Sequence, residues 1–224
     1  MDWQAVELTL RLALLTTLVL VVIGTPLAWW LASTRRPWRG LFHALVALPL
    51  VLPPTVLGFY LLVAMGPDGP IGALTQALGI GRLAFTFEGI LVASVVYSLP
   101  FMVQPLTVAF ASIDRSLLEA SWTLGRSAPA TFFRVVVPLS VSGFLTAAVL
   151  TFAHTVGEFG IVLMIGGSIP GVTRTVSVSI YDDVQALDYG SAAALALPLL
   201  LVSFVALAIT YSVARRRIPW PIGA

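Results

Sequence analysis

The sequence contains no cysteine and no lysine, and each absence narrows what the protein can do. Without cysteine, disulfides, thiolate metal sites and cysteine nucleophiles are excluded. All twelve basic residues are arginine, so a P-loop, whose lysine must reach the nucleotide phosphates, is excluded as well. If the protein depends on ATP, a different polypeptide must hydrolyse it.

Charge is also scarce. Only 10% of the 224 residues are charged and 58% are hydrophobic, whereas soluble domains are about 25% charged. Five apolar runs reach the roughly 20 residues that a membrane-spanning helix needs. They cover 8–32, 41–65, 89–111, 139–165 and 191–213. The sequence therefore predicts an all-α membrane protein with five or six transmembrane helices.

The apolar runs leave little chain for a soluble domain, so we expect one transmembrane domain over 1–224 with its core at 8–213. The N-terminal segment is not typical of a signal peptide. It carries Asp2 and Glu7 and no base before Arg11, and the apolar run that follows is too long. We interpret it as the first span.

Arginine clusters mark the cytoplasmic side of a membrane protein. If the spans alternate, nine arginines fall on one side and three on the other. The nine are Arg35, Arg36, Arg39, Arg115, Arg126, Arg134, Arg215, Arg216 and Arg217, against Arg11, Arg82 and Arg174. The predicted topology has the N-terminus outside and the C-terminus inside, which places residues 112–138 in the cytoplasm.

Two external loops have helical potential. In 66–88, apolar residues recur at helical spacing, which predicts a short interfacial helix. In 166–190, Val176, Val178 and Ile180 alternate with serines like a strand. An open strand edge would leave backbone groups unsatisfied in lipid, so we favour a short helix that dips toward a pore.

Prolines crowd the second and third runs, at Pro49, Pro53, Pro54, Pro100 and Pro105. Each removes a backbone donor and clashes with the preceding turn, so both helices should kink or break. The bends are either static features that improve packing or hinges that line a pore.

The polar segment 112–138, here called the 112–138 element, interrupts the apolar runs. Its first part predicts a short helix with an apolar stripe opposite Arg115, Glu119 and Thr123, followed by Gly125, a residue that favours the left-handed end of a helix. The stripe comprises Leu117, Leu118, Ser121, Trp122 and Leu124.

The second part of the 112–138 element predicts another helix. Ser127 is a suitable cap, Pro129 is tolerated in the first turn, and Pro138 leads into the fourth run. Such an element is either an amphipathic linker that rests on the headgroups or a surface that docks a soluble partner.

The spacing from Glu119 to Pro138 resembles the EAA loop of type I ABC importer permeases. Glu119, Ala120, Gly125 and Pro138 match the family pattern, and Ser121 stands where the family often has alanine. Two milder departures are Val135 and Val137, where the family often has isoleucine and leucine.

This resemblance implies a permease subunit that is not itself an enzyme. The loop would sit in a cleft of a cytoplasmic ATPase subunit, with Glu119 and Gly125 as coupling residues. The implied assembly is a second copy of the chain, two ATPase subunits and an extracytoplasmic oxyanion-binding protein, in a bacterial or archaeal cytoplasmic membrane. No cofactor is expected in this chain, since ATP and magnesium would belong to the ATPase, and no metal or nucleic acid is expected either.

Three further segments, 47–62, 153–167 and 169–175, resemble the molybdate permease subfamily. Sulfate and thiosulfate permeases are its nearest relatives, and both substrate classes are tetrahedral oxyanions. The segment 47–62 and the compact length favour molybdate or tungstate.

His154 and Glu158 lie at i, i+4 in the fourth run, beside Gly157 and Gly160. Ionisable residues inside a span usually face a cavity or a partner. The group is either a local polar pair that serves packing or part of a pore or gate. A bare carboxylate repels a dianion, so we expect Glu158 to pair with His154, Arg174 or backbone donors.

Arg174, between Thr173 and Thr175, is a candidate external contact for an anion or a binding protein. The alternative is a loop ion pair with Asp182 or Asp183.

Two other classes of protein compete with the permease. An ion-coupled secondary transporter should have repeated halves and several ionisable pairs at the midplane, but this chain has one His–Glu pair and an odd number of spans. An intramembrane enzyme would need a nucleophile or a metal cluster that the sequence does not offer.

Overall fold

A computed structural model describes residues 2–215, with side chains to residue 208. Within this range the protein is helical and has no strand, as predicted. The elements are α1 (Trp3–Ser33), α2 (Arg39–Val51), α3 (Pro54–Met65), α4 (Pro70–Ala77), α5 (Phe87–Ala111), α6 (Arg115–Thr123), α7 (Ala128–Thr131), the π-helical turn η1 (Phe132–Val136), α8 (Val137–Leu139), α9 (Val141–Gly157), α10 (Gly160–Gly166), α11 (Val176–Gln185) and α12 (Tyr189–Arg215).

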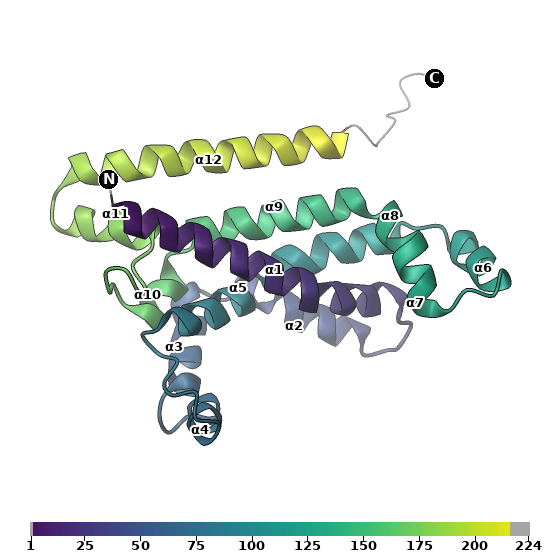
Figure 1. Ribbon diagram of the computed structural model, residues 1–224, viewed down its shortest axis with the longest axis horizontal. Coiled ribbons are helices and arrows are strands. Elements are labelled where there is room, and N and C mark those ends of the chain that lie inside the picture. Colours follow the sequence, from purple (N-terminus) through teal and green to yellow (C-terminus); the bar gives the residue numbers. More distant parts are fainter. Residues whose placement is uncertain (1, 216–224) are drawn as a thin grey trace.

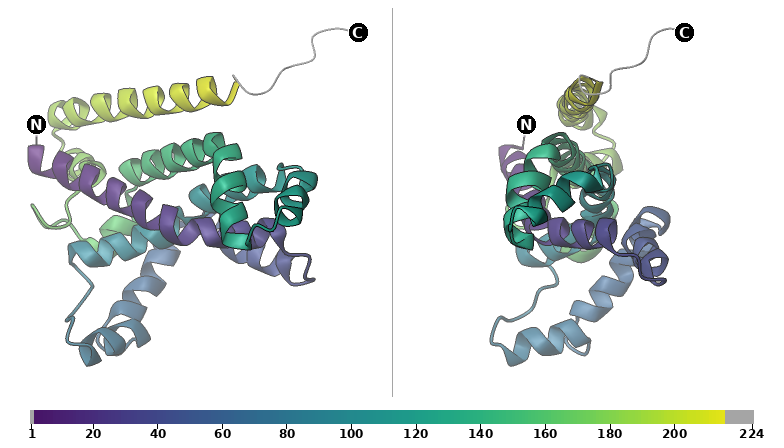
Figure 2. Two further views of the ribbon diagram at one scale, coloured as in Figure 1. Left: turned by 45° about the vertical axis from the view of Figure 1, so that its right-hand side comes forward. Right: turned by 90° about the vertical axis from the view of Figure 1, so that its right-hand side faces the viewer.

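The centre of the molecule is a bundle of α1, α5 and α9, which run side by side along its long axis (Figure 1). Its core includes Leu20, Met102 and Leu106, which are fully buried. Helix α12 lies along the outside, packed on α9 and α11, while α3 and α4 project from the other side (Figures 1 and 2). Only 11% of the apolar window of α12 is buried inside this chain.

The second apolar run is not one helix, which corrects the continuous span predicted over 41–65. It forms α2 and α3, separated at Leu52 and Pro53. Pro53 lacks an N–H, and Pro54 occupies the first turn of α3, where proline is tolerated. With 13 residues, α2 is too short to cross about 30 Å of hydrocarbon at about 1.5 Å per residue, whereas α3 together with α4 forms the candidate span Pro54–Ala77.

The fourth run, 139–165, is also divided. The helical axis turns by 74° between the segments Ala128–Leu139 and Val141–Gly157. A second break at Glu158 and Phe159 separates α9 from α10. Four helical segments are long and apolar enough to span a membrane alone, and the number is five if this bent pair is one span.

The two broken spans meet at their short halves, because α3 packs on α10. A Cβ added to Gly58 would lie 2.8 Å from Cβ of Met164, and one added to Gly160 would lie 2.7 Å from Cβ of Pro54. These distances are shorter than ordinary van der Waals contacts, so glycine is required at both positions. Helices α3 and α10 therefore pack as one close unit.

Proline has a different effect in the third run. Pro100 and Pro105 lie inside α5, which continues unbroken from Phe87 to Ala111, so the break expected there is absent. Half of the apolar window of α5 is buried, mainly against α1 and α9. A single proline therefore does not break a helix here, and Pro49 inside α2 and Pro198 inside α12 behave in the same way.

Both expected loop helices form. Helix α4 lies in 66–88, and α11 covers the alternating segment that resembled a strand. The hydroxyl of Thr9 in α1 accepts a 2.9 Å hydrogen bond from the backbone N–H of Val176, which anchors the start of α11. The dip of α11 toward a pore stays a prediction.

Three of the nine arginines assigned to one side, Arg35, Arg39 and Arg115, line the same hollow at the end of the bundle where α6 lies. This arrangement agrees with the alternation of spans. Arg216 and Arg217 lie outside the described residues. The orientation of the termini relative to the membrane stays a prediction.

Helices α5 and α9 approach closely at Gly143, and we expect Gly143→Ala to destabilise the protein. The new Cβ would lie 2.3 Å from Cβ of Ala109, and such overpacking costs about 1–3 kcal/mol. Alanine is otherwise favoured over glycine in a helix by about 1 kcal/mol. The measurement is thermal unfolding of the purified protein in one detergent.

Gly40→Ala in α2 is the matched control, since a Cβ added there meets no atom within 4 Å. It should leave the unfolding temperature unchanged or raise it slightly. An unfolding temperature of Gly143→Ala equal to that of Gly40→Ala would contradict the close contact of α5 with α9.

Candidate functional site

The first helix of the 112–138 element is capped at both ends. The Asp114 carboxylate accepts a 2.9 Å hydrogen bond from the backbone N–H of Ser116, and this bond lowers the pKa of Asp114. Within this helix, Arg115 and Glu119 form an exposed i, i+4 ion pair, with Nε of Arg115 3.2 Å from Oε1 of Glu119. Sequence analysis missed the cap, although an aspartate directly before a helix is a usual starting signal.

Gly125 ends this helix, as predicted. Its φ of +74° lies in the left-handed region, which favours glycine. The backbone N–H of Arg126 donates to the carbonyl of Ser121 at 3.1 Å, and that of Gly125 donates to Trp122 at 2.9 Å. These bonds satisfy the last carbonyls of α6 and form a Schellman motif.

The apolar stripe predicted on α6 is only partly correct. Leu118 is half-buried and Ser121 is buried, so these residues face the protein. Leu117, Trp122 and Leu124 are exposed by 46%, 46% and 80% of their surfaces. These exposed apolar side chains are available to a docking partner or to the headgroup layer, so the docking surface and the amphipathic linker both stay predictions.

Ser121 has a structural role that sequence analysis did not identify. Its hydroxyl lies 2.9 Å from the hydroxyl of Thr131, and both side chains are buried. The bond joins α6 to α7 across the Gly125 turn. An alanine at position 121 would leave the Thr131 hydroxyl without this partner, which gives a physical reason for serine there.

The second helix begins where predicted. The Ser127 side chain accepts from the backbone N–H of Ala130 at 3.4 Å, and Pro129 lies in the first turn. The π-helical turn η1 ends at Val136, two residues before Pro138, which cannot donate an i→i−4 bond. Pro138 therefore lies in α8, one bend before α9, and not at the start of the span.

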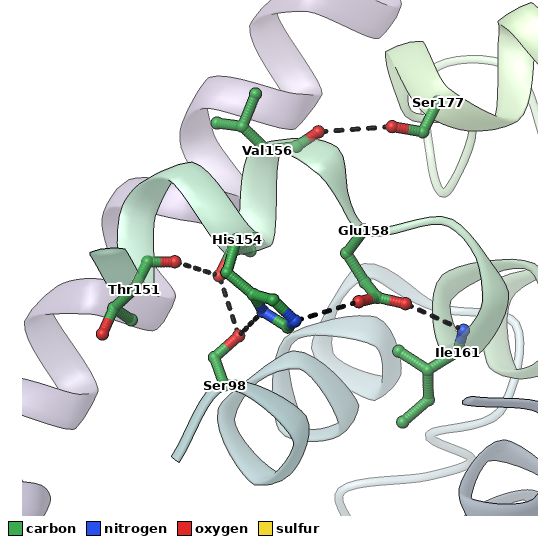
Figure 3. Close-up of polar contacts among 8 residues, drawn as sticks. Ser98, Thr151, His154, Val156, Glu158, Ile161 and Ser177 are labelled. Carbon is green, nitrogen blue, oxygen red and sulfur yellow. Dashed lines mark hydrogen bonds and ion pairs between the residues drawn. The ribbon is translucent and has the colours of Figure 1, made fainter. Parts of the chain in front are cut away.

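His154 and Glu158 face each other at the break between α9 and α10 (Figure 3). Nε2 of His154 lies 3.7 Å from Oε2 of Glu158, and the backbone N–H of Ile161 donates to Oε1 of Glu158 at 3.2 Å. The carboxylate therefore caps α10 as well as pairing with the imidazole. Of the expected partners, His154 and backbone donors are present.

His154 is held by side chains of α5 that sequence analysis missed. Nδ1 lies 3.0 Å from the hydroxyl of Ser98 (Figure 3). The same hydroxyl lies 3.0 Å from that of Thr155. The ring stacks on Phe101 at 3.9 Å between centroids, and Tyr97 lies 5.1 Å away. A serine in a span was the available signal, because buried hydroxyls need partners.

The two glycines of this group have different surroundings. Gly157 ends α9, and a Cβ added there would meet no atom within 4 Å. Gly160 starts α10 and is held against Pro54. The break therefore has one crowded side, toward α3, and one open side.

Arg174 forms the ion pair that sequence analysis gave as the alternative, with its Nε 3.6 Å from Oδ2 of Asp182. It also donates to the hydroxyl of Ser168 at 3.0 Å. The surrounding hollow, of about 230 Å³, is lined by Asp2 and Asp183 as well as Asp182. Because these carboxylates outnumber the one arginine, the hollow does not suit a free oxyanion.

Thr173 and Thr175 are buried, with 0% and 1% of their surfaces exposed. Thr173 donates to the carbonyl of Gly166 at 2.7 Å and accepts from the backbone N–H of Ile169 at 3.1 Å. Their burial argues against the expected contact with an external anion. Arg174 alone of the three residues reaches the surface.

Sequence comparison identifies relatives along nearly the whole chain. The molybdenum transport system permease protein ModB of Azotobacter vinelandii is 62% identical over 211 residues, which cover 94% of this chain and 93% of that protein. The probable sulfate transport system permease protein cysT of Zygnema circumcarinatum is 34% identical over 215 residues, covering 96% and 74%.

Structural comparison finds the same architecture in a solved transporter. The bacterial alginate ABC transporter, in complex with an alginate pentasaccharide-bound periplasmic protein, matches with a TM-score of 0.75 at 18% identity, covering 95% of this chain and 78% of that one. This likeness shows that the chain has the fold of an ABC importer permease.

The family described as "Binding-protein-dependent transport system inner membrane component" matches residues 24–219, which include both broken spans and the 112–138 element. The chain therefore belongs to the family of binding-protein-dependent transport system inner membrane components.

Proposed function

We propose that this chain is the membrane-spanning subunit of an ABC importer for molybdate or tungstate. The observation that carries the proposal is the 62% identity to a molybdenum permease over nearly the full length of both chains. At this identity the pore-lining side chains of the two proteins should be largely the same. The protein is a multi-pass component of the inner membrane.

The proposed assembly contains two copies of this chain, two cytoplasmic ATPase subunits and an extracytoplasmic oxyanion-binding protein. The chain has no lysine for a P-loop, so ATP and magnesium would bind to the ATPase subunits. Exposed Leu117 and Leu124, beside the Arg115–Glu119 pair, support α6 as the surface that the ATPase receives. Arg174 would contact the binding protein on the external side.

The contacts support a path for the mechanical coupling. The Ser121–Thr131 hydrogen bond joins α6 to α7, which continues through η1 and α8 to the bend at Ser140 and then into α9. Helix α9 ends at the His154–Glu158 pair. A displacement of α6 by the ATPase would thus reach the break in the fourth span through α7, η1, α8 and, beyond the 74° bend, α9.

At that break, Glu158 and His154 would act as a gate and not as an anion site. Glu158 is buried and His154 is partly buried, the carboxylate repels a dianion, and its second oxygen is engaged by the start of α10. Opening would separate α10 from α9 on the side of Gly157, where the surroundings are free, while α10 stays packed on α3.

A sulfate permease is the second candidate, because a probable sulfate permease is 34% identical over most of this chain. Both anions are tetrahedral dianions, so charge does not distinguish them. The lower identity and the lower coverage of that relative favour the molybdenum assignment.

Uptake into proteoliposomes tests the assignment. The permease is reconstituted with its ATPase and with the binding protein encoded beside it, and uptake of molybdate, tungstate and sulfate is measured with and without internal ATP. We expect ATP-dependent uptake of molybdate or tungstate that excess sulfate does not inhibit. Equal uptake of sulfate would contradict the substrate, and uptake without the ATPase would contradict the class of transporter. Liposomes with the permease and ATPase but without the binding protein are the control.

A further inference from the structure

A hollow of about 440 Å³ lies at the end of the bundle where α6 lies. It is enclosed by the ends of α1 and α5, the start of α2, and α6. Arg35, Arg39 and Arg115 line it, together with Trp29 and Trp122. These five residues are here called the arginine pocket.

The arginine pocket has an excess of positive charge. No carboxylate is among its lining residues in the described part of the chain. Arg35 has no ion pair within residues 2–208, and Nε of Arg39 donates to Nε2 of His43 at 3.3 Å. Arg115 pairs with Glu119, but that pair is exposed and contributes at most about 1 kcal/mol. Three cations around one hollow repel each other until an anion binds.

The position of the pocket indicates which anion. Helices α1 and α5 end at Ser33 and Ala111, so the pocket lies where the apolar spans give way to polar chain. Tryptophan side chains favour this level of a membrane, and Trp29 and Trp122 supply two here. The pocket thus lies at the depth of lipid headgroups.

The lining also favours a lipid over a free ion. Beyond the arginines, the walls include the apolar side chains of Phe110, Ile113 and Leu118. A small inorganic anion would fill only part of the pocket and leave this apolar surface exposed to water. A phospholipid places its phosphate against the arginines and its glycerol and first methylenes against the apolar wall.

We propose that the arginine pocket binds the phosphate headgroup of an anionic phospholipid. Arg35 and Arg39 would hold the phosphate from α1 and α2, and Arg115 and Trp122 would contact it from α6. The lipid would therefore support α6 on the side of the arginine pocket, while Leu117 and Leu124, which do not line the pocket, stay available to the ATPase.

Native mass spectrometry of the full complex of permease and ATPase tests this site. Phosphatidylglycerol and phosphatidylethanolamine are added at equal concentration, and the lipid retained by each variant is measured. We expect wild type to retain phosphatidylglycerol selectively. The double variant Arg35→Gln/Arg39→Gln should retain roughly 25-fold less, since each arginine near an anionic lipid contributes about fivefold.

Arg36→Gln is the matched control, because Arg36 is adjacent in sequence but does not line the pocket. It should retain lipid like wild type, and Arg35→Lys/Arg39→Lys should restore most of the loss. Equal retention by the double glutamine variant and by Arg36→Gln would overturn the proposal. So would equal retention of phosphatidylethanolamine.

Two further measurements distinguish a bound phospholipid from other occupants of the pocket. Inorganic phosphate at the same concentration should not displace phosphatidylglycerol, and displacement would indicate a free-anion site. Retention should be the same for the permease with and without its ATPase. Loss of lipid on ATPase binding would show that an acidic segment of the ATPase fills the pocket instead.

Discussion

Replacing Gly125 by valine should abolish most ATP-driven uptake while the protein still folds. A β-branched residue at φ +74° is strained by about 1–2 kcal/mol, which shifts the population of the turn by roughly 5- to 30-fold. The turn sets the angle between α6 and α7, so the strain is relieved by moving α6 away from its docking position. Uptake into proteoliposomes and pull-down of the ATPase measure the effect.

Gly79→Val is the matched control for Gly125→Val. Gly79 has φ +70°, and a Cβ added at either glycine would meet no atom within 4 Å. Gly79 lies beyond α4, away from α6, so its variant should carry the same strain and still transport. Gly125→Asn should retain most uptake, because asparagine tolerates this conformation. Equal uptake by the two valine variants would contradict a coupling role for the Gly125 turn.

Replacing Glu158 should separate the structural role of this residue from its role as a gate. Glu158→Ala removes both the partner of His154 and the acceptor for the Ile161 N–H, and an unpaired buried donor costs about 1–3 kcal/mol. We expect a lower unfolding temperature and little uptake. Glu158→Gln keeps an oxygen for the Ile161 N–H, so stability should be near that of wild type while uptake still falls.

The informative comparison is between uptake and ATP hydrolysis in Glu158→Gln. A gate defect should lower the amount of substrate taken up for each ATP hydrolysed. A folding defect should instead lower uptake and ATP hydrolysis together, because less of the complex assembles. Glu7→Gln, which removes a carboxylate from an exposed position, is the control and should transport normally. Wild-type uptake and coupling in Glu158→Gln would show that the gate role is wrong.

Local features of the 112–138 element were predictable because neighbouring residues decide them. A glycine after the last turn ends α6, and Ser127 caps the next helix, both as expected. Which α6 side chains are buried was not predictable in the same way. Leu124 belongs to the apolar pattern but is exposed, since the Gly125 turn directs it away from the protein.

The prolines show that residue type alone does not decide where a helix breaks. Pro53 and Pro54 break the second run, whereas Pro100 and Pro105 lie inside an unbroken α5. The residue type is the same in both places. Single prolines are also accommodated at Pro49 in α2 and at Pro198 in α12, whose apolar window is only 11% buried. The break occurs where Pro53 is followed directly by Pro54, because the residue before a proline is disfavoured in a helix.

The sequence by itself determined that this chain is helical and lies in a membrane, and it predicted the two-helix element that carries the family pattern. Those conclusions rest on hydropathy and on spacings within a few turns, which the chain carries locally. Only the tertiary structure placed Ser98 against His154, 56 residues apart, and gathered Arg35, Arg39 and Arg115 around one hollow. Such contacts depend on how helices pack, because packing decides which of many equivalent polar side chains become neighbours.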